Sequence, residues 1–436
     1  MAEGLAPAAR APAPGGPGAP GPAPPRRRAL DGVFWLLFGS SALSFLSIGA
    51  TTPVLPLFVH DELGGNALEV GIVTGITALV AIVLRPSAGA FGDRRGRRVA
   101  ALLGSLVMGA GAALLLAPEL LPLVIVARLA VGLGEALLSI ASMAWVIDRA
   151  PPEHRGRALG AFGMSIWLGL GLGPLIGESL RVDHGYSAVW IFCALAGLGA
   201  GALLIFAPAP RRADAPPSDA LGEDGWRRFL PQIPRAALRP GAVIALALYG
   251  EGIMGAFGVI HLVDRGVPEG AHLGGAASIF TIFAAVTFAA RLGAVWLVDR
   301  VGPYLCALLA TAFVGAGWVL FAVADGFPAA AGGAALVGCG YALLYPALGL
   351  LVTTRVAAAD RGVGLGTFMA FMDMGFGAGA VIGGVLVGLS STGLTFWSAA
   401  AAALIGAVLL LTPGARPLRA VRSDSQLEPL GAEPHP

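Results

Sequence analysis

The sequence predicts an all-α membrane protein with twelve transmembrane helices in two pseudo-symmetric six-helix halves. The composition, the apolar segments and an internal repeat each point to this fold class. Hydrophobic residues make up 56% of the 436 positions and charged residues only 12%, against roughly 25% charged residues in an average soluble domain. A large soluble helical core is disfavoured, because it does not need so many uncharged runs of spanning length.

Twelve apolar segments follow one another with short polar turns between them. A bilayer core of about 30 Å needs roughly 20 apolar residues per crossing helix. The segments are expected near 33–59, 68–91, 99–117, 120–147, 158–181, 187–207, 241–263, 272–298, 304–323, 329–355, 362–389 and 392–412. We therefore expect two halves at 33–207 and 241–412, a cytoplasmic linker at 208–240, a disordered cytoplasmic tail at 1–32 and a cytoplasmic tail at 413–436.

A charged turn after the second segment returns in the second half. Residues 89–98 read G-A-F-G-D-R-R-G-R-R, and a weaker copy, V-W-L-V-D-R-V-G, occupies 295–302. Asp93 and Asp299 are 206 positions apart, and we call residues related by this offset twins. Further twins are Arg85 and Arg291, Gly132 and Gly338, Arg155 and Arg361, and Gly177 and Gly383. A chain that repeats itself at half its length, with charged turns between apolar helices, is most simply a duplicated membrane transporter.

Arginines are concentrated at alternate turns. They precede the first segment, follow the second and fourth, and occur throughout the middle linker, whereas the other turns hold little beyond Arg181 and Arg265. The positive-inside rule then places both termini and the linker in the cytoplasm. Nucleic-acid binding is excluded as a function, because the arginines are spread over short turns. The chain has no lysine and one asparagine, Asn66, which hints at a bacterial protein of the inner membrane.

Enzymatic function is disfavoured by the residue types present. No metal-ligand cluster, phosphate loop or nucleophile–His–acid set is visible, so no metal or cofactor is expected. Cys193, Cys306 and Cys339 lie in apolar segments without ligand spacing and are expected to be buried small hydrophobes.

The residues of the charged turn have structural roles of their own and also resemble a family signature. Gly89 and Gly92 allow close helix approach, and Asp93 is expected to cap the next helix. The pattern strongly resembles the loop 2–3 signature of the major facilitator superfamily, and residues 148–160 (D-R-A-P-P-E-H-R-G-R-A-L-G) are similar to its helix 4–5 junction. The residues assigned to gating and the conformational switch are Gly89, Asp93, Arg94, Gly96, Arg97, Arg98, Asp148, Arg155 and Asp299.

Further segments resemble the drug/proton antiporters of the same superfamily. Arg128–Glu135 looks like the helix-4 arginine motif, and Pro53 with Pro56 is similar to the helix-1 proline pair. Residues 169–177 match the helix-5 antiporter motif through Gly169, Gly173, Pro174 and Gly177, although Glu178 replaces the usual final glycine. Close packing explains this stripe by itself. The resemblance covers about residues 30–412 and implies the major facilitator fold around a central cavity that opens alternately to each side, export, and sliding contact between the halves at the stripe.

Buried charges without a charged twin are the candidates for proton coupling. They are Arg128, Glu135, Glu251 and Asp373, whose twins are Ala334, Tyr341, Phe45 and Trp167. A charge at a helix centre costs roughly 2.5–3.5 kcal/mol on insertion scales, and a carboxyl in such a setting can take up and release protons near neutral pH. Arg85 and Arg291 are kept in both halves, which indicates a structural or gating role, for example pairing with Asp93 and Asp299.

Two interpretations of helix 4 remain open. Arg128 and Glu135 are seven residues apart, about 10.5 Å along one helix face. Protonation of Glu135 could weaken its hold on Arg128 and shift the balance between inward-open and outward-open states. Alternatively, the two residues form a permanent ion pair that braces the helix. Glu251 and Asp373 could contact a cationic substrate or carry the proton, whereas Glu178 is expected to be solvated at the outer end of helix 5.

The predicted function is proton-coupled efflux of a small lipophilic or cationic compound by a monomer. Its partners are the substrate, protons and the lipid bilayer. The candidate cavity residues are Phe45, Trp167, Phe257, Tyr341 and Phe368. A sugar is disfavoured because the spanning segments lack Asn and Gln apart from Asn66 at an edge. The alternatives are a proton-coupled importer, an exporter of a metabolite such as a sugar or organic acid, and a membrane sensor on a transporter scaffold.

Overall fold

The computed structural model describes residues 31–117, 120–151, 154–208, 234–270, 274–356 and 361–412. The predicted tail 413–436, nearly all of the tail 1–32 and most of the linker 208–240 lie outside the described residues. Within the described ranges every regular element is helical.

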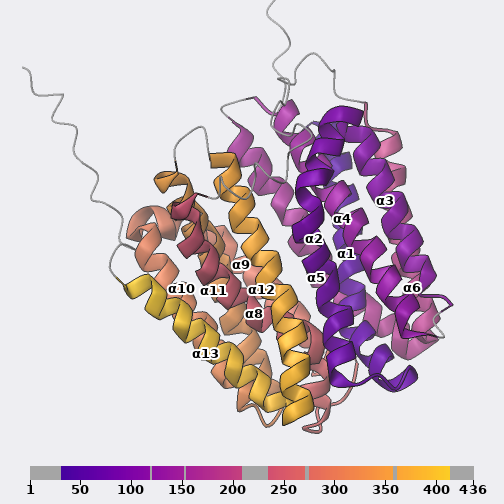
Figure 1. Ribbon diagram of the computed structural model, residues 1–436, viewed down its shortest axis with the longest axis vertical. Helices are drawn as coiled ribbons and strands as arrows, with labels where there is room; N and C mark the ends of the chain where they lie inside the picture. Colours follow the sequence, from indigo (N-terminus) through magenta and orange to yellow (C-terminus); the bar gives the residue numbers. More distant parts are fainter. Residues whose placement is uncertain are drawn as a thin grey trace, which may run out of the picture.

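The N-terminal half contains six long helices, drawn from indigo to magenta in Figure 1. They are α1 (Gly32–Leu57), continued by the π-helical turn η1 (Phe58–Glu62), α2 (Ala67–Arg95), α3 (Arg97–Leu114), α4 (Leu121–Arg149), α5 (Arg155–His184) and α6 (Tyr186–Ile205).

The C-terminal half, which ends in yellow, repeats this arrangement. Its helices are α8 (Arg235–Val263), α9 (Ser278–Val301), α10 (Pro303–Ala322), α11 (Phe327–Arg355), α12 (Arg361–Leu389) and α13 (Thr392–Leu411). Eleven described helices are long and apolar enough to cross a membrane, and α9 has a shorter apolar stretch, Ser278–Gly293. The predicted fold class is confirmed.

The helix boundaries follow the sequence prediction closely, and the charged turns explain why. Gly96 ends α2 and Gly302 ends α9, with φ of 100° and 92°, a region that glycine adopts at little cost. These two glycines are twins, so the repeat extends to backbone conformation. The cap expected from Asp93 is wrong: α2 continues through Arg95, α3 has no side-chain cap, and Asp93 pairs with Arg97 one turn later.

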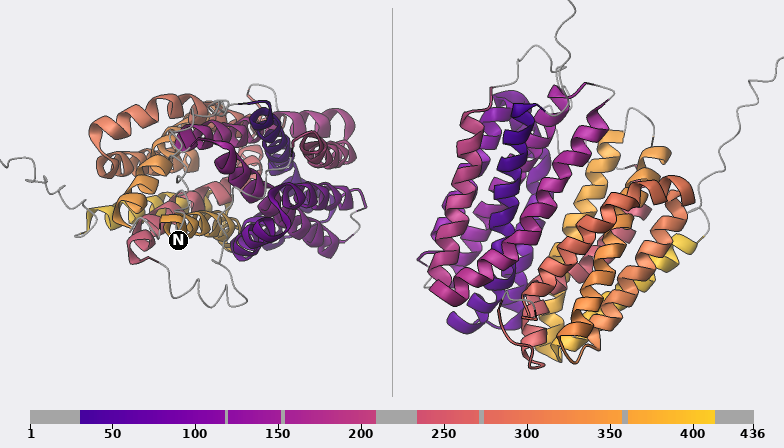
Figure 2. Two further views of the ribbon diagram at one scale, coloured as in Figure 1. Left: turned by 90° about the horizontal axis from the view of Figure 1, so that it is seen from above. Right: turned by 180° about the vertical axis from the view of Figure 1, so that it is seen from behind.

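Two helix pairs make the main contacts between the halves, and α1 and α2 also pack against α8. Helix α2 packs against α12, and α5 packs against α9, as the two halves lie side by side in Figures 1 and 2. Under the 206-residue offset α2 is the twin of α9, and α5 is the twin of α12. These two main contacts between the halves are therefore equivalent by the internal symmetry.

The helix ends define two faces of the molecule. At one face, called the terminal face, Asp31 at the start of α1 pairs with Arg149 at the end of α4, and Arg239 in α8 donates to the carbonyl of Thr412 after α13. The opposite face, called the far face, carries the starts of α2 and α9. In Figure 1 the axes of the two halves diverge toward the upper end of the view.

Glycines on the inter-half helices show where the two halves touch. A Cβ on Gly71 of α2 would lie 2.4 Å from the Ala380 carbonyl of α12, and one on Gly377 would lie 2.7 Å from the Leu79 side chain. The twins Gly160 of α5 and Gly366 of α12 lie eleven residues nearer the terminal face than Gly171 and Gly377, on the same side of each helix. A Cβ added at Gly160 or Gly366 would meet nothing within 4 Å. The halves are therefore in contact toward the far face and apart toward the terminal face.

Candidate functional site

An ion pair bridges the halves near the middle of the molecule. The Nε of Arg85 in α2 lies 2.8 Å from Oδ2 of Asp373 in α12, and Nη2 of Arg85 donates to Oδ1 at 3.0 Å. The two side chains are 26% and 16% exposed. A planar guanidinium that holds both oxygens of a carboxylate is a strong, directional contact. Arg85 thus pairs with Asp373 of the other half rather than with Asp93.

Glu135 of α4 is the third charge at this position. Its side chain is buried, and its charge acts on both Arg85 and Asp373. No hydrogen bond or ion pair joins it to Arg128 among the described residues. Arg128 instead donates from Nε to the Val73 carbonyl at 3.2 Å, and its Nη1 is buried without a hydrogen-bond partner. In this state the structure does not bring the two members of the predicted helix-4 pair together.

Arg291, the twin of Arg85, has a different partner. Its guanidinium carbon lies 5.0 Å from the ring centre of Trp167 in α5 and 5.5 Å from that of Tyr345 in α11. Trp167 is the twin of Asp373, so both arginines contact the equivalent position of the other half. One contact is ionic and the other is a cation–π contact.

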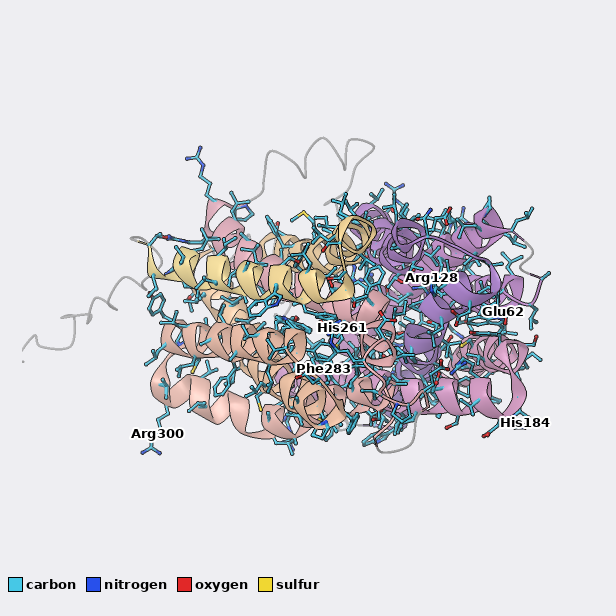
Figure 3. The ribbon with its side chains drawn as sticks, turned by 90° about the horizontal axis from the view of Figure 1, so that it is seen from below. Glu62, Arg128, His184, His261, Phe283 and Arg300 are labelled. Atoms are coloured by element: carbon cyan, nitrogen blue, oxygen red, sulfur yellow. The ribbon has the colours of Figure 1, made fainter. Side chains whose placement is uncertain are left out.

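Aromatic rings continue from this contact into the C-terminal half. Trp167 contacts Phe283 with ring centres 6.2 Å apart, and Phe283 contacts Tyr341 at 5.6 Å. The Tyr341 hydroxyl donates to the Ala247 carbonyl at 2.6 Å, within electrostatic range of Glu251. Figure 3 shows Phe283 inside the C-terminal half and Arg128 inside the N-terminal half. The carboxyl of Glu251 has no hydrogen-bond partner among the described residues.

The other predicted cavity residues lie outside this row of rings. Phe368 is buried and contacts Tyr345, with ring centres 5.7 Å apart. Phe257 is buried in a hydrophobic core cluster with Val54 and Val59. Phe45 is partly exposed on α1.

Residues assigned to the conformational switch form a network at the terminal face. Arg97 pairs with Asp93 and lies 3.3 Å from Oδ2 of Asp148 at the end of α4, and Arg98 donates to the Ile205 carbonyl at the end of α6 at 2.6 Å. Arg155 is exposed at the start of α5, and the side chain of Asp299 lies outside the described residues. The network joins helices of one half.

Asp31 and Arg149 extend the same network. Burial raises the pKa of Asp31, but the hydrogen bond and charge of Arg149 and the backbone N–H of Phe34 outweigh burial and hold that pKa below its ordinary value. The carboxylate therefore stays ionised at the start of α1 and ties that helix to α4.

Another ion-pair network crosses between the halves at the far face. Arg181 holds Glu178 through bonds of 2.9 and 2.8 Å and reaches Glu269, in the segment after α8, at 2.7 Å. The expectation that Glu178 is solvated is wrong, because its side chain is 0% exposed. Arg181, one turn further along the helix, compensates the buried charge.

The glycine stripe of α5 packs within one half. Added Cβ atoms at Gly169, Gly173 and Gly177 would lie 2.2–2.7 Å from α1 backbone atoms, so the expected sliding contact between the halves is wrong for these glycines. Pro174 lies inside α5 without ending it. The inter-half contact is made instead by Gly171, whose carbonyl accepts from the Thr281 hydroxyl of α9 at 3.2 Å.

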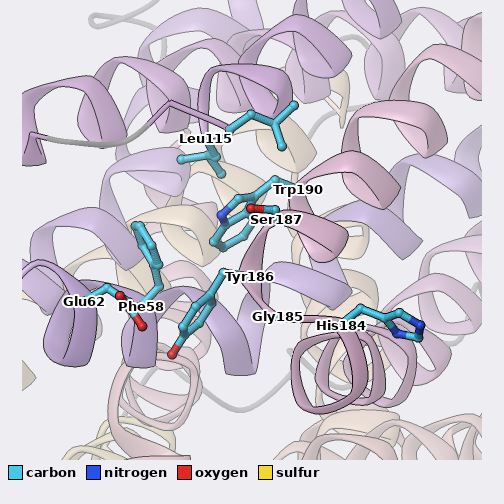
Figure 4. A pocket seen from close by; sticks show the side chains of 9 residues that line it. Phe58, Glu62, Leu115, His184, Gly185, Tyr186, Ser187 and Trp190 are labelled. Carbon is cyan, nitrogen blue, oxygen red and sulfur yellow. The ribbon is translucent and has the colours of Figure 1, made fainter.

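A surface hollow of about 270 Å³ opens at the far face. Figure 4 shows it walled by Phe58, Tyr186 and Trp190, with Glu62 and His184 at its rim. It lies within the N-terminal half and does not include the central charges. In the described part of the chain, no three His, Cys, Asp or Glu residues are grouped so that they could hold a metal ion.

Comparisons with known proteins agree on one family. A profile of the Major Facilitator Superfamily matches residues 37–273 and again 252–434. An uncharacterized MFS-type transporter of Burkholderia mallei (strain SAVP1) is 29% identical over 84% of this chain and 88% of its own length. A relative of the same description from Salmonella typhimurium (strain LT2) is 28% identical over 84% of this chain and 93% of its own.

Solved structures show the same fold at low sequence identity. The nucleoside transporter NupG superposes with a TM-score of 0.72 at 14% identity, covering 87% of this chain and 98% of that one. The human organic anion transporter MFSD10 gives 0.68 at 19%, covering 89% and 100%, and a peptide transporter, POT, gives 0.70 at 16%, covering 87% and 93%.

Proposed function

The chain belongs to the major facilitator superfamily, and from that premise we propose that it is a proton-coupled antiporter that exports a small lipophilic compound by alternating access. The observation that carries this proposal is the Arg85–Asp373 ion pair, a titratable contact between the two moving halves. Secondary transporters of this fold work by rocking one half against the other around a central site.

Protonation of Asp373 changes the strength of that contact directly. The ionised pair attracts by about 4 kcal/mol at 4 Å for an effective dielectric constant near 20, and a neutral carboxyl loses most of this attraction. A proton on Asp373 therefore loosens α2 from α12 and makes movement of the halves easier. Glu135, which is buried in α4, is the second acid that we assign to this step.

Glu251 is assigned to the same task from the other half. It lies beside Tyr341 at the end of the row of rings, away from the Arg85–Asp373 pair. An acid in a helix centre without a hydrogen-bond partner among the described residues is costly when ionised. We therefore assign Glu251 the role of a further proton-carrying acid.

The distribution of arginines and the shape of the interface support an assignment of the side to which this state opens. The arginine-rich turns lie at the terminal face, which the positive-inside rule places in the cytoplasm. Separation of the halves at the terminal face supports the proposal that this state is open to the cytoplasm, where an exporter loads its cargo. The row of Trp167, Phe283 and Tyr341 supplies an apolar wall for a lipophilic compound.

Proton movement in everted membrane vesicles tests the proposal even while the cargo is unidentified. Respiring vesicles hold an acid interior that quenches an acridine dye, and addition of a cargo from a panel of lipophilic compounds is expected to restore fluorescence. Asp373→Asn vesicles should not respond, whereas Asp183→Asn, an exposed acid at the far end of α5, serves as the matched control. A cargo that crosses wild-type vesicles equally fast with and without the gradient would contradict proton coupling.

A further inference from the structure

Arg291 makes cation–π contacts with two rings from opposite halves. Trp167 belongs to α5 of the N-terminal half and Tyr345 to α11 of the C-terminal half, at 5.0 and 5.5 Å from the guanidinium carbon. Stacking against aromatic faces fixes the plane of a guanidinium while its N–H groups point outward along the edge. The two rings thus orient the donors of Arg291 without using them.

Those donors have no acceptor among the residues that the structure describes. No ion pair or hydrogen bond engages Arg291 there, and its nitrogens are not sealed from solvent as Nη1 of Arg128 is. The side chain is partly exposed. Arg291 therefore presents a charged, pre-oriented edge to open space beside the inter-half contact.

The internal repeat offers a comparison, because the twin of Arg291 has an acid as its partner. That twin, Arg85, holds the carboxylate of Asp373 through two nitrogens. At the equivalent position of the other contact the carboxylate is replaced by the indole of Trp167. One of the two symmetry-related arginines thus has an acid from the chain itself, and the other has only rings.

We infer that Arg291 binds a carboxylate or similar oxyanion carried by the transported compound, and that Trp167 and Tyr345 contact the planar part of the same molecule. This inference rests on the proposed function and narrows its cargo to organic anions with an aromatic or other flat apolar portion. Guanidinium and carboxylate match in geometry and charge. A cationic cargo would instead be repelled by Arg291.

Binding of three matched probes to the purified full chain tests the inference. Naphthoate, naphthylmethanol and naphthylmethylammonium share one ring system and differ only in charge, so that calorimetry in a neutral detergent measures the contribution of charge. Wild type is expected to bind naphthoate about 10-fold or more tighter than naphthylmethanol, the gain of one charge-assisted hydrogen-bonded pair. In Arg291→Gln this ratio should fall to about 1, with naphthylmethanol affinity retained as evidence of a folded site.

Two further variants separate the effect of the planar guanidinium from the effect of charge alone and from the loss of any arginine on α9. Arg291→Lys keeps the charge without the planar edge and should retain part of the preference for naphthoate. Arg300→Gln removes an exposed arginine from the same helix and should leave the ratio unchanged. The inference is overturned if none of the probes binds wild type, if the ammonium probe binds best, or if Arg291→Gln keeps the wild-type ratio.

Competition with an anionic lipid distinguishes a transported anion from a bound lipid phosphate. If added phosphatidylglycerol displaces naphthoate from wild type but not from Arg291→Gln, and binds more tightly than naphthoate, Arg291 holds a lipid phosphate and the cargo assignment is wrong. Because binding is measured without a proton gradient, a failure of proton coupling in vesicles leaves these affinities unaffected. The two proposals can therefore fail separately.

Discussion

Asp373 and Trp167 occupy equivalent positions in the two halves, and each contacts the equivalent arginine of the other half. The chemistry nevertheless differs, because a carboxylate can be neutralised by a proton and an indole cannot. In the proposed mechanism, proton binding acts on the α2–α12 contact, while the cation–π contact between α5 and α9 has no acid to protonate. The two contacts are equivalent in position and differ in chemistry.

A double-mutant cycle measures the strength of the ionic contact. Arg85→Gln and Asp373→Asn are each expected to lower unfolding stability in detergent, and the double variant to lose less than the sum. The coupling free energy should be about 1–3 kcal/mol, between values for exposed and fully buried pairs. Additive losses would show that the contact contributes nothing to cohesion of the halves.

The sequence identified most of the charged residues of the candidate site, but it did not predict how they pair. The absence of charged twins identified Asp373, Glu135 and Glu251 as unusual, and the repeat identified Arg85 and Arg291 as equivalent. Pairing across the halves could not be predicted, because no sequence spacing encodes a contact between residues 288 positions apart. Glu178 was misjudged for a related reason: its compensating cation, Arg181, also reaches across to Glu269.

At the scale of single helices, the glycine stripe of α5 determines how closely α1 can approach. Gly173→Ala would place a Cβ 2.7 Å from backbone atoms of Gly49 and Ala50, and neither can move without shifting the helix. We expect a loss of about 1–3 kcal/mol in unfolding stability. Gly163→Ala, in the same helix with nothing within 4 Å of the new Cβ, should instead be neutral or stabilising by up to about 1 kcal/mol. Equal effects of the two substitutions would contradict the packing assigned to the stripe.

The tie between α1 and α4 predicts a dependence on pH. The lowered pKa of Asp31 means that its contribution to stability is present above the ordinary value of 3.8 and is lost as the pH falls through the lower, folded-state value. Asp31→Asn keeps a capping side chain but loses the ion pair with Arg149, and should cost up to about 1 kcal/mol at neutral pH. Unfolding curves of wild type and variant are expected to converge in strong acid; a constant difference would refute the ionic origin.

Helix positions themselves were predictable because hydrophobic length and glycine placement are local properties. All twelve predicted segments correspond to described helices. The largest differences between predicted and observed boundaries are at the starts of α8 and α9. The α9 segment was expected from residue 272, but Gly274 has φ of 106°, and the helix begins only at Ser278. Composition does not reveal such a turn inside an apolar run.

For the whole molecule, contact toward the far face and separation toward the terminal face predict which positions water can reach. Cysteines at the twins Gly160 and Gly366 are expected to react with a membrane-impermeant maleimide supplied at the terminal face. Cysteine at Gly377, packed against α2, should stay protected. Protection of the first two sites, or labelling of all three, would contradict the inward-open state.

Uphill transport in proteoliposomes of defined orientation tests the central claim most directly. With a proton gradient imposed toward the terminal-face side, wild type is expected to concentrate a lipophilic cargo on the far-face side above its starting level. A protonophore should abolish this accumulation, and Asp373→Asn should only equilibrate the cargo. Equilibration by wild type despite the gradient, or accumulation that survives both the protonophore and Asp373→Asn, would contradict a proton-driven antiporter coupled through the Arg85–Asp373 pair.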